Sequence, residues 1–448
     1  MAGQISDSQK LSDAQIIAQV CKGLEQVVRN GRTLDWLRAR QSKALASPLH
    51  QDLMYGCVRH FLSLQHELSQ YLAKPLRNKD HDLQMLLLVG AYQLQFSRRP
   101  AHAVVNNTVN ACRPLGKPWA RGLVNGVLRK MQRNAEHQAT TSATNNPQWL
   151  IEKITQQYPN DAEAVLRAND QRAPMVLRVN TSKISTADYC SELSSQEIAF
   201  SVCEPNEAIV LAKPQPASSL PGWNEGQIAV QELSAQFPAN LVLQNIPAAI
   251  DSPVLFDACC APGGKLYQLH ELLSKRYAAH RLVGNDKNPK RLAETLQIGQ
   301  RLGHADDSKI TLRSADATTP DAISKGTYDV MIVDAPCSGS GTIRRNPDIR
   351  LLLQPNQIAE HQSLQLALLF NLWRGLKQGG TLLYSTCSVF DEENDQVIEQ
   401  FVDEHSEACI QPLQLPFGTA TRFGWQMLPS EPNTDGFYYA LIQKAHGS

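Results

Sequence analysis

Two cysteines follow strongly apolar stretches and lie in loops of small residues. Cys337 lies in DAPCSGSG, directly after VMIV, and Cys387 lies in STCS, directly after TLLY. If both stretches are parallel strands, their carboxyl ends place the two thiols at one edge of the sheet. A thiolate there is a candidate nucleophile, although most buried cysteines act only as small hydrophobic side chains. No matching CxxC pair or Cys/His spacing accompanies them, so we expect no metal site.

Several aspartates also end apolar stretches. Asp286 ends RLVGND, about 20 residues after a glycine pair, where a carboxylate can bind both hydroxyls of an adenosine ribose. It could equally cap the next helix, which begins NPKRLAETL. Asp316 ends KITLRSAD, where it could accept from an adenine amino group, and Asp334 opens DAPCSGSG. Acidic strand ends without a phosphate loop favour an adenosine ligand lacking a pyrophosphate, such as S-adenosylmethionine.

The glycine pair lies in DACCAPGGK, residues 257–265, directly after the apolar residues 254–256. Gly263 and Gly264 lack side chains, so the backbone can turn tightly there and approach a ligand closely. The loop matches neither GxGxxG nor the GxxxxGK[ST] pattern of a phosphate-binding loop. Taken alone, it could be an ordinary turn between a strand and a helix.

The elements that must position these residues are strands that alternate with helices. From residue 254 onward the apolar stretches VLFDACC, RLVGND, KITLRSADA, YDVMIVDAPC and GGTLLYSTCSV are separated by helical or turn-rich segments. This alternation predicts a parallel sheet with helices on both faces. Ligands bind outside the carboxyl ends of the strands in such folds, and the residues above lie at those ends.

The chain before this sheet divides into three segments. Residues 1–133 carry apolar residues at helical spacing and predict an all-helical domain, with helices over 13–29, 53–72, 82–96, 102–112 and 119–131. Residues 134–147 (NAEHQATTSATNNP) are small and polar, as in a linker. Residues 148–230 combine short helices with strands and predict a small α+β module, followed by the domain with the parallel sheet over 231–448.

The charge of the chain is unevenly distributed. The 43 basic and 43 acidic residues cancel, but residues 1–150 hold 19 Lys+Arg against 9 Asp+Glu, a net charge of +10. The rest of the chain therefore has a net charge of −10. Such an asymmetry favours a polyanionic partner for the first segment. A helical domain with a basic solvated face is the simpler alternative.

Several broad classes of protein fit the composition poorly. The hydrophobic fraction of 42% and the charged fraction of 19% are typical of a globular chain. Apolar runs such as residues 85–89 are far shorter than a membrane span, and the first residues, MAGQISDSQK, form no apolar signal core. Ten cysteines are too sparse for a disulfide scaffold. We therefore expect a cytoplasmic chain with reduced thiols and no membrane partner.

The motifs resemble one family closely. DACCAPGGK, DAPCSGSG and STCSV resemble motifs I, IV and VI of the RNA cytosine-5 methyltransferases of the Sun/Fmu group. VQELSAQ (residues 230–236) and DGFYYALIQK (residues 435–444) resemble two further blocks of that group. HAVVNNTVN and RGLVNGVLRKM resemble the NusB-like helical domain at the N-terminus of a member that modifies 16S ribosomal RNA. The resemblance covers nearly the whole chain.

The resemblance implies a NusB-like all-α domain, an RRM-like α+β module and a Rossmann-like class I methyltransferase domain. It implies S-adenosyl-L-methionine as methyl donor and 16S rRNA, rather than DNA, as the substrate of a monomer. Cys387 would be the nucleophile, Cys337 would assist release of the methylated base, and Asp334 would lie between the cofactor and the base. The implied cofactor-binding residues are Cys259, Cys260, Ala261, Pro262, Gly263, Gly264, Lys265, Asp286, Asp316 and Asp334. Cys260, where the family usually has a small residue such as Ala, and the polar neighbours of Asp286 depart from the pattern without removing a required group.

Spacing alone does not decide which cysteine attacks. In DNA cytosine-5 enzymes the cysteine of the Pro-Cys pair is the nucleophile, which here would be Cys337, whereas the RNA group assigns that role to Cys387. Two alternative functions also remain. One is a related methyltransferase acting on tRNA, against which the NusB-like segment argues. The other is a non-catalytic RNA-binding or antitermination factor, which would not require the cysteine pair.

Overall fold

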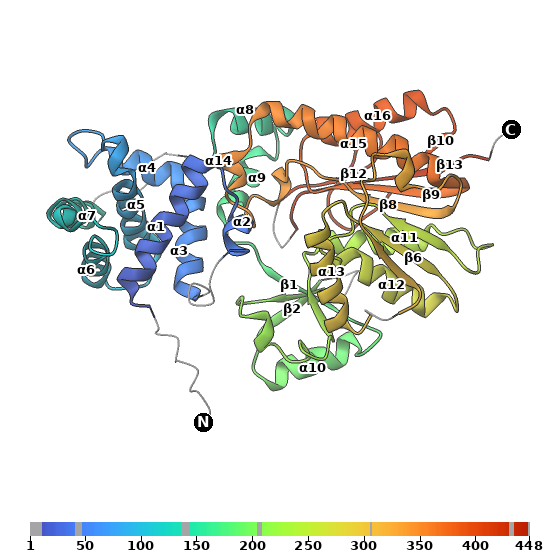
Figure 1. Ribbon diagram of the computed structural model, residues 1–448, viewed down its shortest axis with the longest axis horizontal. Helices are drawn as coiled ribbons and strands as arrows, with labels where there is room; N and C mark the ends of the chain where they lie inside the picture. The colour runs from blue at the N-terminus through green and yellow to red at the C-terminus, as the bar shows by residue number, and fades with distance from the viewer. Residues whose placement is uncertain are drawn as a thin grey trace. The chain divides into compact units, whose positions relative to one another are not determined.

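The computed structural model describes residues 11–40, 47–135, 144–203, 208–304, 307–429 and 434–446 (Figure 1). Most of the predicted linker, residues 136–143, lies outside them. The chain forms two compact units. One contains the chain up to Gln156 together with Asn169–Gln171 and Ile343–Leu353, and the other contains the remaining residues.

The first unit is a helical bundle, as its apolar spacing predicts. Helix α5 is its centre, because nearly every residue from Leu83 to Gln93 is buried and the other helices must therefore surround it. The predicted helix over 53–72 is instead two helices that meet at His60. The helices of the bundle are α1 (Asp13–Asn30), α2 (Leu34–Arg38), α3 (Pro48–Arg59), α4 (Phe61–Ser69), α5 (His81–Phe96), α6 (Ala101–Ala111) and α7 (Arg121–Ala135).

A short segment from the second half of the chain also belongs to the helical unit. Ile343–Leu353 contains α14 (Ile349–Leu352), and the fully buried guanidinium of Arg350 anchors it. Its two terminal nitrogens donate to four oxygens at 2.6–3.1 Å. The four acceptors are the backbone oxygens of Arg59, Asn145 and Asn169 and a carboxylate oxygen of Asp170. These acceptors offset the cost of burying the charge.

The predicted α+β module is confirmed. After α8 (Gln148–Gln157) and α9 (Ala162–Asp170), four strands form an antiparallel sheet in the order β2-β3-β1-β4. Buried side chains of β1 and β3 pack against Tyr189 and Leu193 of α10. The elements of the module are β1 (Met175–Val179), α10 (Thr186–Ser195), β2 (Phe200–Cys203), β3 (Ala208–Leu211) and β4 (Ile228–Val230).

A large sheet forms the rest of the second unit. Its order is β11-β12-β13-β9-β8-β5-β6-β7, and β10 pairs with β13. The five strands predicted from the apolar stretches pair in parallel. The strands are β5 (Val254–Asp257), β6 (Arg281–Asn285), β7 (Ile310–Arg313), β8 (Tyr328–Asp334), β9 (Leu376–Thr386), β10 (Ala408–Gln411), β11 (Thr419–Ala420), β12 (Trp425–Met427) and β13 (Phe437–Lys444).

The sheet is mixed, not wholly parallel as the alternation of strands and helices suggested. Strand β13 runs antiparallel to β9, with Tyr439 opposite Ser385, and β10 and β12 pair antiparallel with β13. A strand buried on both faces reads as a continuous apolar run in either direction. The residues of β13 are therefore apolar enough for a central strand but carry no signal of their orientation.

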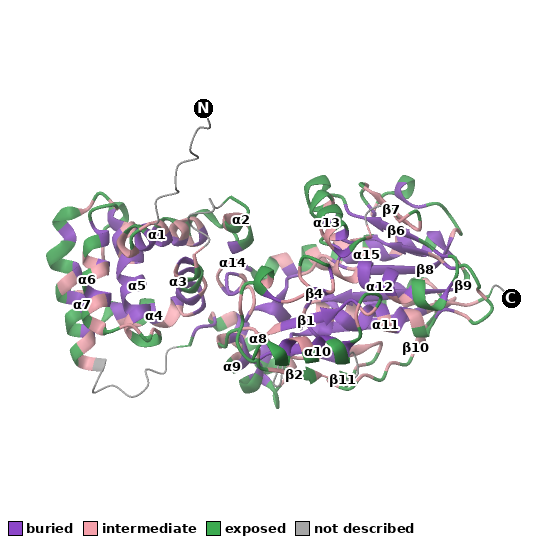
Figure 2. Cartoon of the chain, turned by 90° about the horizontal axis from the view of Figure 1, so that it is seen from below, coloured by how far each residue is buried: buried purple, intermediate pink, exposed green. Residues whose placement is uncertain are grey.

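Helices cover both faces of this sheet. On one face, buried side chains of α11 (Phe237–Gln244) and α12 (Gly264–Arg276) share a core with Leu255, Leu282 and Val330. On the other face, side chains of α15 (Pro355–Gly375) and α16 (Asp395–Glu404) pack with Phe256, Met331 and Tyr384. Figure 2 shows the buried strands of the sheet in purple, with exposed residues concentrated on the helices around them. This is the doubly wound arrangement predicted from the sequence.

The strand order creates a switch point. The chain proceeds from β5 to β6 and β7 on one side and then returns to β8 and β9 on the other side of β5. Ligands of open α/β sheets bind outside the carboxyl ends of the strands at such a point.

In the described part of the chain, no helix combines the length and apolarity needed to cross a membrane.

Candidate active site

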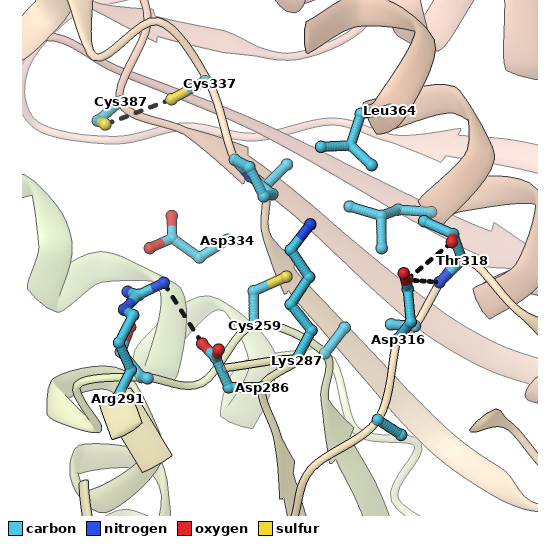
Figure 3. A pocket seen from close by; sticks show the side chains of 17 residues that line it. Cys259, Asp286, Lys287, Arg291, Asp316, Thr318, Asp334, Cys337, Leu364 and Cys387 are labelled. Atoms are coloured by element: carbon cyan, nitrogen blue, oxygen red, sulfur yellow. Dashed lines mark hydrogen bonds and ion pairs between the residues drawn. The ribbon is translucent and has the colours of Figure 1, made fainter. Parts of the chain in front are cut away.

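A pocket lies at the carboxyl ends of the parallel strands, where the sequence predicted it. Residues that follow β5, β6, β7, β8 and β9 all reach its wall (Figure 3). The pocket therefore draws on every strand of the parallel part of the sheet. Its lining residues are Ala258, Cys259, Ala261, Asp286, Lys287, Arg291, Ala315, Asp316, Ala317, Thr318, Asp334, Ala335, Pro336, Cys337, Leu364, Leu368 and Cys387.

The glycine loop turns sharply from β5 into α12. Gly263 has φ 103°, a conformation that side chains disfavour, and a Cβ there would lie 2.8 Å from atoms of Tyr267 and Thr295. Cys259 and Ala261 of this loop line the pocket, whereas the Cys260 side chain packs into the core beneath it. Pro262, Gly263, Gly264 and Lys265 do not line the pocket wall. Their predicted part in cofactor binding remains a prediction.

Asp286 lies at the pocket wall directly after β6 and is almost fully buried. One of its carboxylate oxygens accepts from the backbone N–H of Asn288 at 2.8 Å, and the other lies 3.5 Å from Arg291. The helix-cap alternative is not what the structure shows, because Asn288 caps α13 (Pro289–Leu302) with its own side chain. Asp286 therefore shapes the turn before the helix and presents its carboxylate to the pocket.

Asp316 lies in the turn after β7 and lines the same pocket. Its Oδ1 accepts from the backbone N–H of Thr318 at 3.0 Å and from the Thr318 hydroxyl at 2.7 Å, as Figure 3 shows. These two hydrogen bonds lower the pKa of Asp316 below its ordinary value. The side chain is therefore an anion that can accept further hydrogen bonds at neutral pH.

Three charged groups meet beside the pocket. Lys265 Nζ lies 2.6 Å from Asp334 Oδ2, and this ion pair outweighs the effect of burial and raises the pKa of Lys265. Burial and the nearby charge of Asp334 raise the pKa of Asp257 to about 7, although Lys265 opposes this shift. The sequence grouped Asp334 with the cofactor loop, and the ion pair with Lys265 places the two side by side.

The two predicted cysteines meet. Cys337 Sγ and Cys387 Sγ are 3.4 Å apart and both line the pocket, as the dashed line in Figure 3 marks. The hydrogen bond with Cys387, together with burial, raises the pKa of Cys337 well above its ordinary value. Cys337 is therefore held in the protonated form. The convergence of two loops about 50 residues apart was predictable only from the parallel sheet.

Some pocket residues escaped the sequence analysis. Lys287, Arg291, Thr318 and Leu364 line the pocket but belong to no motif that the sequence made recognisable. Arg291 could have been suspected, because it lies one helical turn inside α13, where a cation can reach back to Asp286. Leu364 comes from α15, and only the packing of that helix on the sheet brings it to the pocket.

The donors and acceptors suit an adenosine ligand. The carboxylate oxygens of Asp286 and Asp316 can accept hydrogen bonds from hydroxyl and amino groups. The sequence has no GxGxxG loop, whose backbone amides would bind a phosphate. The carboxylates of Asp257 and Asp334 would repel a pyrophosphate and favour a ligand carrying positive charge. The residues present therefore fit S-adenosylmethionine. Among the described residues, no group of His, Cys, Asp and Glu is arranged to hold a metal ion.

A doubly wound sheet with this pocket defines a class I methyltransferase. Comparison with known families gives a more specific result. Residues 247–443 match the family model "16S rRNA methyltransferase RsmB/F", residues 146–218 match the ferredoxin-like domain of the same proteins, and residues 9–133 match the NusB family. The resemblance of the motifs to those of RNA methyltransferases is thereby confirmed.

Individual relatives match almost from end to end. A probable ribosomal RNA small subunit methyltransferase B from Coxiella burnetii is 38% identical, with 94% of this chain and 97% of the relative aligned. The ribosomal RNA small subunit methyltransferase B of Shewanella oneidensis is 36% identical over 96% of this chain and 99% of its own length. The chain belongs to the family of ribosomal RNA small subunit methyltransferases B.

A solved structure shows the same fold. The alignment with the crystal structure of the protein PH0851 spans 97% of this chain and all of that chain, with a TM-score of 0.78 and 24% sequence identity. At this identity the likeness establishes the fold alone. It extends over the helical domain, the ferredoxin-like module and the methyltransferase domain, as the sequence predicted.

Proposed function

We propose that this protein transfers a methyl group from S-adenosyl-L-methionine to carbon 5 of a cytosine in 16S ribosomal RNA. The observation that carries the proposal is the pair of thiols, 3.4 Å apart, at the wall of a pocket fit for the methyl donor. The curated relatives supply the substrate, because they are named ribosomal RNA small subunit methyltransferases. When bound, the cofactor supplies an electrophilic methyl group.

The thiol of Cys387 is proposed as the nucleophile. Carbon 5 of cytosine is too weak a nucleophile by itself, and addition of a thiolate to carbon 6 gives the ring enamine character. A bond forms between Cys387 Sγ and carbon 6, and carbon 5 then takes the methyl group as its bond to the sulfonium breaks and the neutral thioether S-adenosylhomocysteine leaves. Loss of the carbon 5 proton restores the double bond and expels the thiolate. The assignment of the two roles follows the resemblance of STCSV to the RNA group's motif, because a contact between the two sulfurs does not itself tell them apart.

Cys337 and Asp334 are proposed to assist. Cys337 Sγ lies within 3.4 Å of Cys387 Sγ, so any ring bonded to Cys387 lies within reach of Cys337 for the release step. Asp334 lies at the pocket wall, where its carboxylate can hydrogen-bond the N3/N4 edge of the cytosine and stabilise the adduct. Lys265 holds that carboxylate in place through the 2.6 Å ion pair.

The parts outside the pocket are proposed to bind the RNA. The domains predicted over 1–133 and 148–230 would position the substrate through phosphate contacts, while the domain over 231–448 carries out the reaction. The target base must leave its stack or lie in a loop to reach the thiols. We propose that the chain acts on 16S rRNA as a monomer in the cytoplasm.

Replacement of each cysteine tests the chemistry. Cys387→Ser should lower methyl transfer to 16S rRNA from a deletion strain by at least about 10³-fold, because a hydroxyl is a far weaker nucleophile. Cys337→Ala should instead trap an RNA–protein adduct that survives a denaturing gel. An adduct formed by Cys387→Ala and absent from Cys337→Ala would reverse the two roles. Near wild-type transfer by Cys387→Ser would refute the covalent mechanism.

Bisulfite sequencing of total RNA, with 16S rRNA and tRNA both read, tests the substrate. A cytosine protected from conversion in wild-type cells should become sensitive in a deletion strain and protected again after complementation. Complementation by Cys387→Ser should leave that cytosine sensitive. If the only cytosine that changes lies in a tRNA, the proposed substrate is wrong while the chemistry stands.

A further inference from the structure

A fully buried glutamate lies behind the two thiols. Glu393 ends the short 3-10 helix η8 (Asp391–Glu393), six residues after Cys387, and its side chain is inaccessible to solvent. It lies outside the pocket wall, so it does not touch the proposed ligands directly. A buried carboxylate is costly unless hydrogen-bond donors surround it.

The donors to Glu393 come from both cysteine loops. The backbone N–H of Ser338, the residue after Cys337, donates to Oε1 at 2.7 Å, and the Ser338 hydroxyl donates to Oε2. The hydroxyl of Ser388, the residue after Cys387, donates to Oε2 at 2.5 Å. One carboxylate therefore binds the immediate neighbours of both thiols.

Other contacts complete this connection. The Ser340 hydroxyl lies 3.0 Å from the Ser388 hydroxyl and accepts from the backbone N–H of Val389 at 3.0 Å. Gln365 of α15 donates to Glu393 at 3.4 Å and to the backbone oxygen of Pro336 at 2.9 Å. A direct backbone bond, from Gly341 N–H to the oxygen of Cys387, also joins the loops. Glu393 is the charged member of this otherwise neutral set.

We propose that Glu393 is a positioning residue that fixes the separation and orientation of the Cys337 and Cys387 thiols by bridging the two loops. The inference rests on the proposed function, because it explains how the pair is set for attack and release. Strong hydrogen bonds to a charged acceptor hold a loop more firmly than neutral ones. Two cysteines on separate loops need such a restraint, since neither loop is a regular element.

The charge of Glu393 has a second effect. It lies close enough to contribute to the raised pKa of Cys337, after the larger effects of the hydrogen bond with Cys387 and of burial. The same carboxylate therefore helps to keep Cys337 protonated while it restrains the loop. An amide at this position would keep the volume but lose both the charge and one hydrogen-bond acceptor.

Glu393→Gln tests the role in turnover. We expect kcat for methyl transfer to 16S rRNA to fall about 10- to 100-fold, with KM for S-adenosylmethionine changed less than about threefold, because only the thiols shift. The matched control is Asp395→Asn. Asp395 is a carboxylate two residues away that accepts from Tyr438, Thr421 and the backbone of Arg422, and contacts neither cysteine loop. This control should lose stability but keep kcat within about threefold.

Oxidation of the thiols gives a readout that needs no RNA. Diamide takes two electrons and two protons from adjacent thiols and forms a disulfide, which peptide mass mapping assigns to Cys337 and Cys387. Glu393→Gln should slow this pairing at least about fivefold relative to wild type and Asp395→Asn, because the loss of the restraint on the two sulfurs outweighs the easier ionisation of Cys337. If Glu393→Gln does not fold, Ser388→Ala, which removes one bridging hydroxyl, should slow it by a smaller factor.

The two hypotheses fail in different ways. Wild-type kcat together with wild-type disulfide formation in Glu393→Gln would overturn the positioning role while leaving the cysteine mechanism intact. Equal loss of kcat in Glu393→Gln and Asp395→Asn would also overturn it, because that pattern indicates general destabilisation. Failure of Cys337→Ala and Cys387→Ala alike to trap an adduct would refute the proposed covalent mechanism, whatever the disulfide assay gives.

Discussion

The charges beside the thiols determine which ligand the pocket accepts. Lys265 forms an ion pair with Asp334, and burial together with the nearby charge of Asp334 raises the pKa of Asp257 to about 7. A ligand carrying a sulfonium and an ammonium group would lower the pKa of Asp257 and be stabilised by it in return. The selectivity for a cationic methyl donor thus begins with individual side chains.

Gly263 is the residue at which the cofactor loop tolerates least change. Gly263→Ala should destabilise the protein by about 2–3 kcal/mol, because the new side chain combines an unfavourable φ of 103° with close contacts to Tyr267 and Thr295. Affinity for S-adenosylmethionine should fall at least about tenfold as the loop shifts. Urea denaturation and isothermal titration calorimetry measure the two effects.

Gly326→Ala is the control for backbone strain. Gly326 also has a positive φ, 60°, but its new Cβ would meet nothing within 4 Å. This variant should therefore lose about 1 kcal/mol of stability and keep its affinity for the cofactor. Equal losses of stability and affinity in the two variants would show that the contacts with Tyr267 and Thr295 do not matter.

At the scale of elements, the sequence predicted the strands and the site that depend on local patterns of apolar residues. The apolar runs before Cys259, Asp286, Asp316, Asp334 and Cys387 marked the five parallel strands. Four of these strands are largely buried, whereas the edge strand β7 is only partly buried. The pocket followed from them, since parallel strands bring their carboxyl ends to one edge. The two thiols and their aspartates were found for the same reason.

Contacts between residues far apart in the sequence could not be predicted from local sequence patterns. The antiparallel direction of β13 is decided by its partner β9, and the break at His60 is decided by how α3 and α4 pack. The segment Ile343–Leu353 belongs to the helical unit through contacts with residues about 180–290 positions away, made by Arg350. Glu393 was missed for the same reason, because its partners in the Cys337 loop are 55 residues distant.

Three histidines connect elements on the α12 face of the sheet. His270 of α12 lies 3.2 Å from His280, which precedes β6, and its other nitrogen lies 3.2 Å from Asp307. His304, after α13, contacts Glu271, which also pairs with Arg178 of β1. Burial lowers the pKa of His270, and burial together with the charge of His270 lowers the pKa of His280 to about 4.

This cluster predicts a pH dependence of stability. The folded pKa of His280 is about 4 and its ordinary value is 6.5, so the unfolded chain binds more protons between these values. Its contribution to stability is therefore fully present above about pH 6.5 and is lost as the pH falls towards 4. His280→Gln should flatten the curve of unfolding free energy against pH in that window, measured by urea denaturation.

A histidine on the other face of the sheet is the control. His361 lies in α15, which packs on the opposite face from α12, so His361→Gln should leave the pH dependence as in wild type. If His280→Gln follows the wild-type curve between pH 4 and 6.5, the buried cluster does not titrate as its surroundings imply. The neighbouring charges to consider are Glu271, Asp307 and Lys309, which all contribute to the shifts.

At the scale of the whole molecule, the neutral net charge conceals a division between the helical segment and the rest. Residues 1–150 have a net charge of +10, yet some of these cations are already paired. Lys117 contacts Asp80 and Asp82, and Arg99 contacts Asp13. Several exposed cations of this segment remain for phosphate groups. Four of them lie on α7 or between α6 and α7, namely Arg113, Arg121, Arg129 and Lys130.

Replacing these four residues with Gln should weaken RNA binding, because fewer counterions are then released from the RNA when the protein binds. The logarithm of the affinity for 16S rRNA falls with the logarithm of the salt concentration by about 0.7–0.9 per phosphate contact. The quadruple variant should therefore have a slope smaller by about 3 than that of wild type, with its methyl-donor affinity unchanged. Filter binding between about 50 and 300 mM salt measures the slope.

A matched quadruple variant separates docking from simple loss of charge. Lys275, Arg281, Lys325 and Arg374 are exposed cations of the other unit, all within the domain predicted over 231–448, and their replacement with Gln removes the same total charge. If the helical domain docks the RNA, this second variant keeps a slope close to that of wild type. Equal reductions of the slope in both variants would mean that RNA binding depends only on the net charge of the protein. The uneven distribution of charge along the chain would then have no functional meaning.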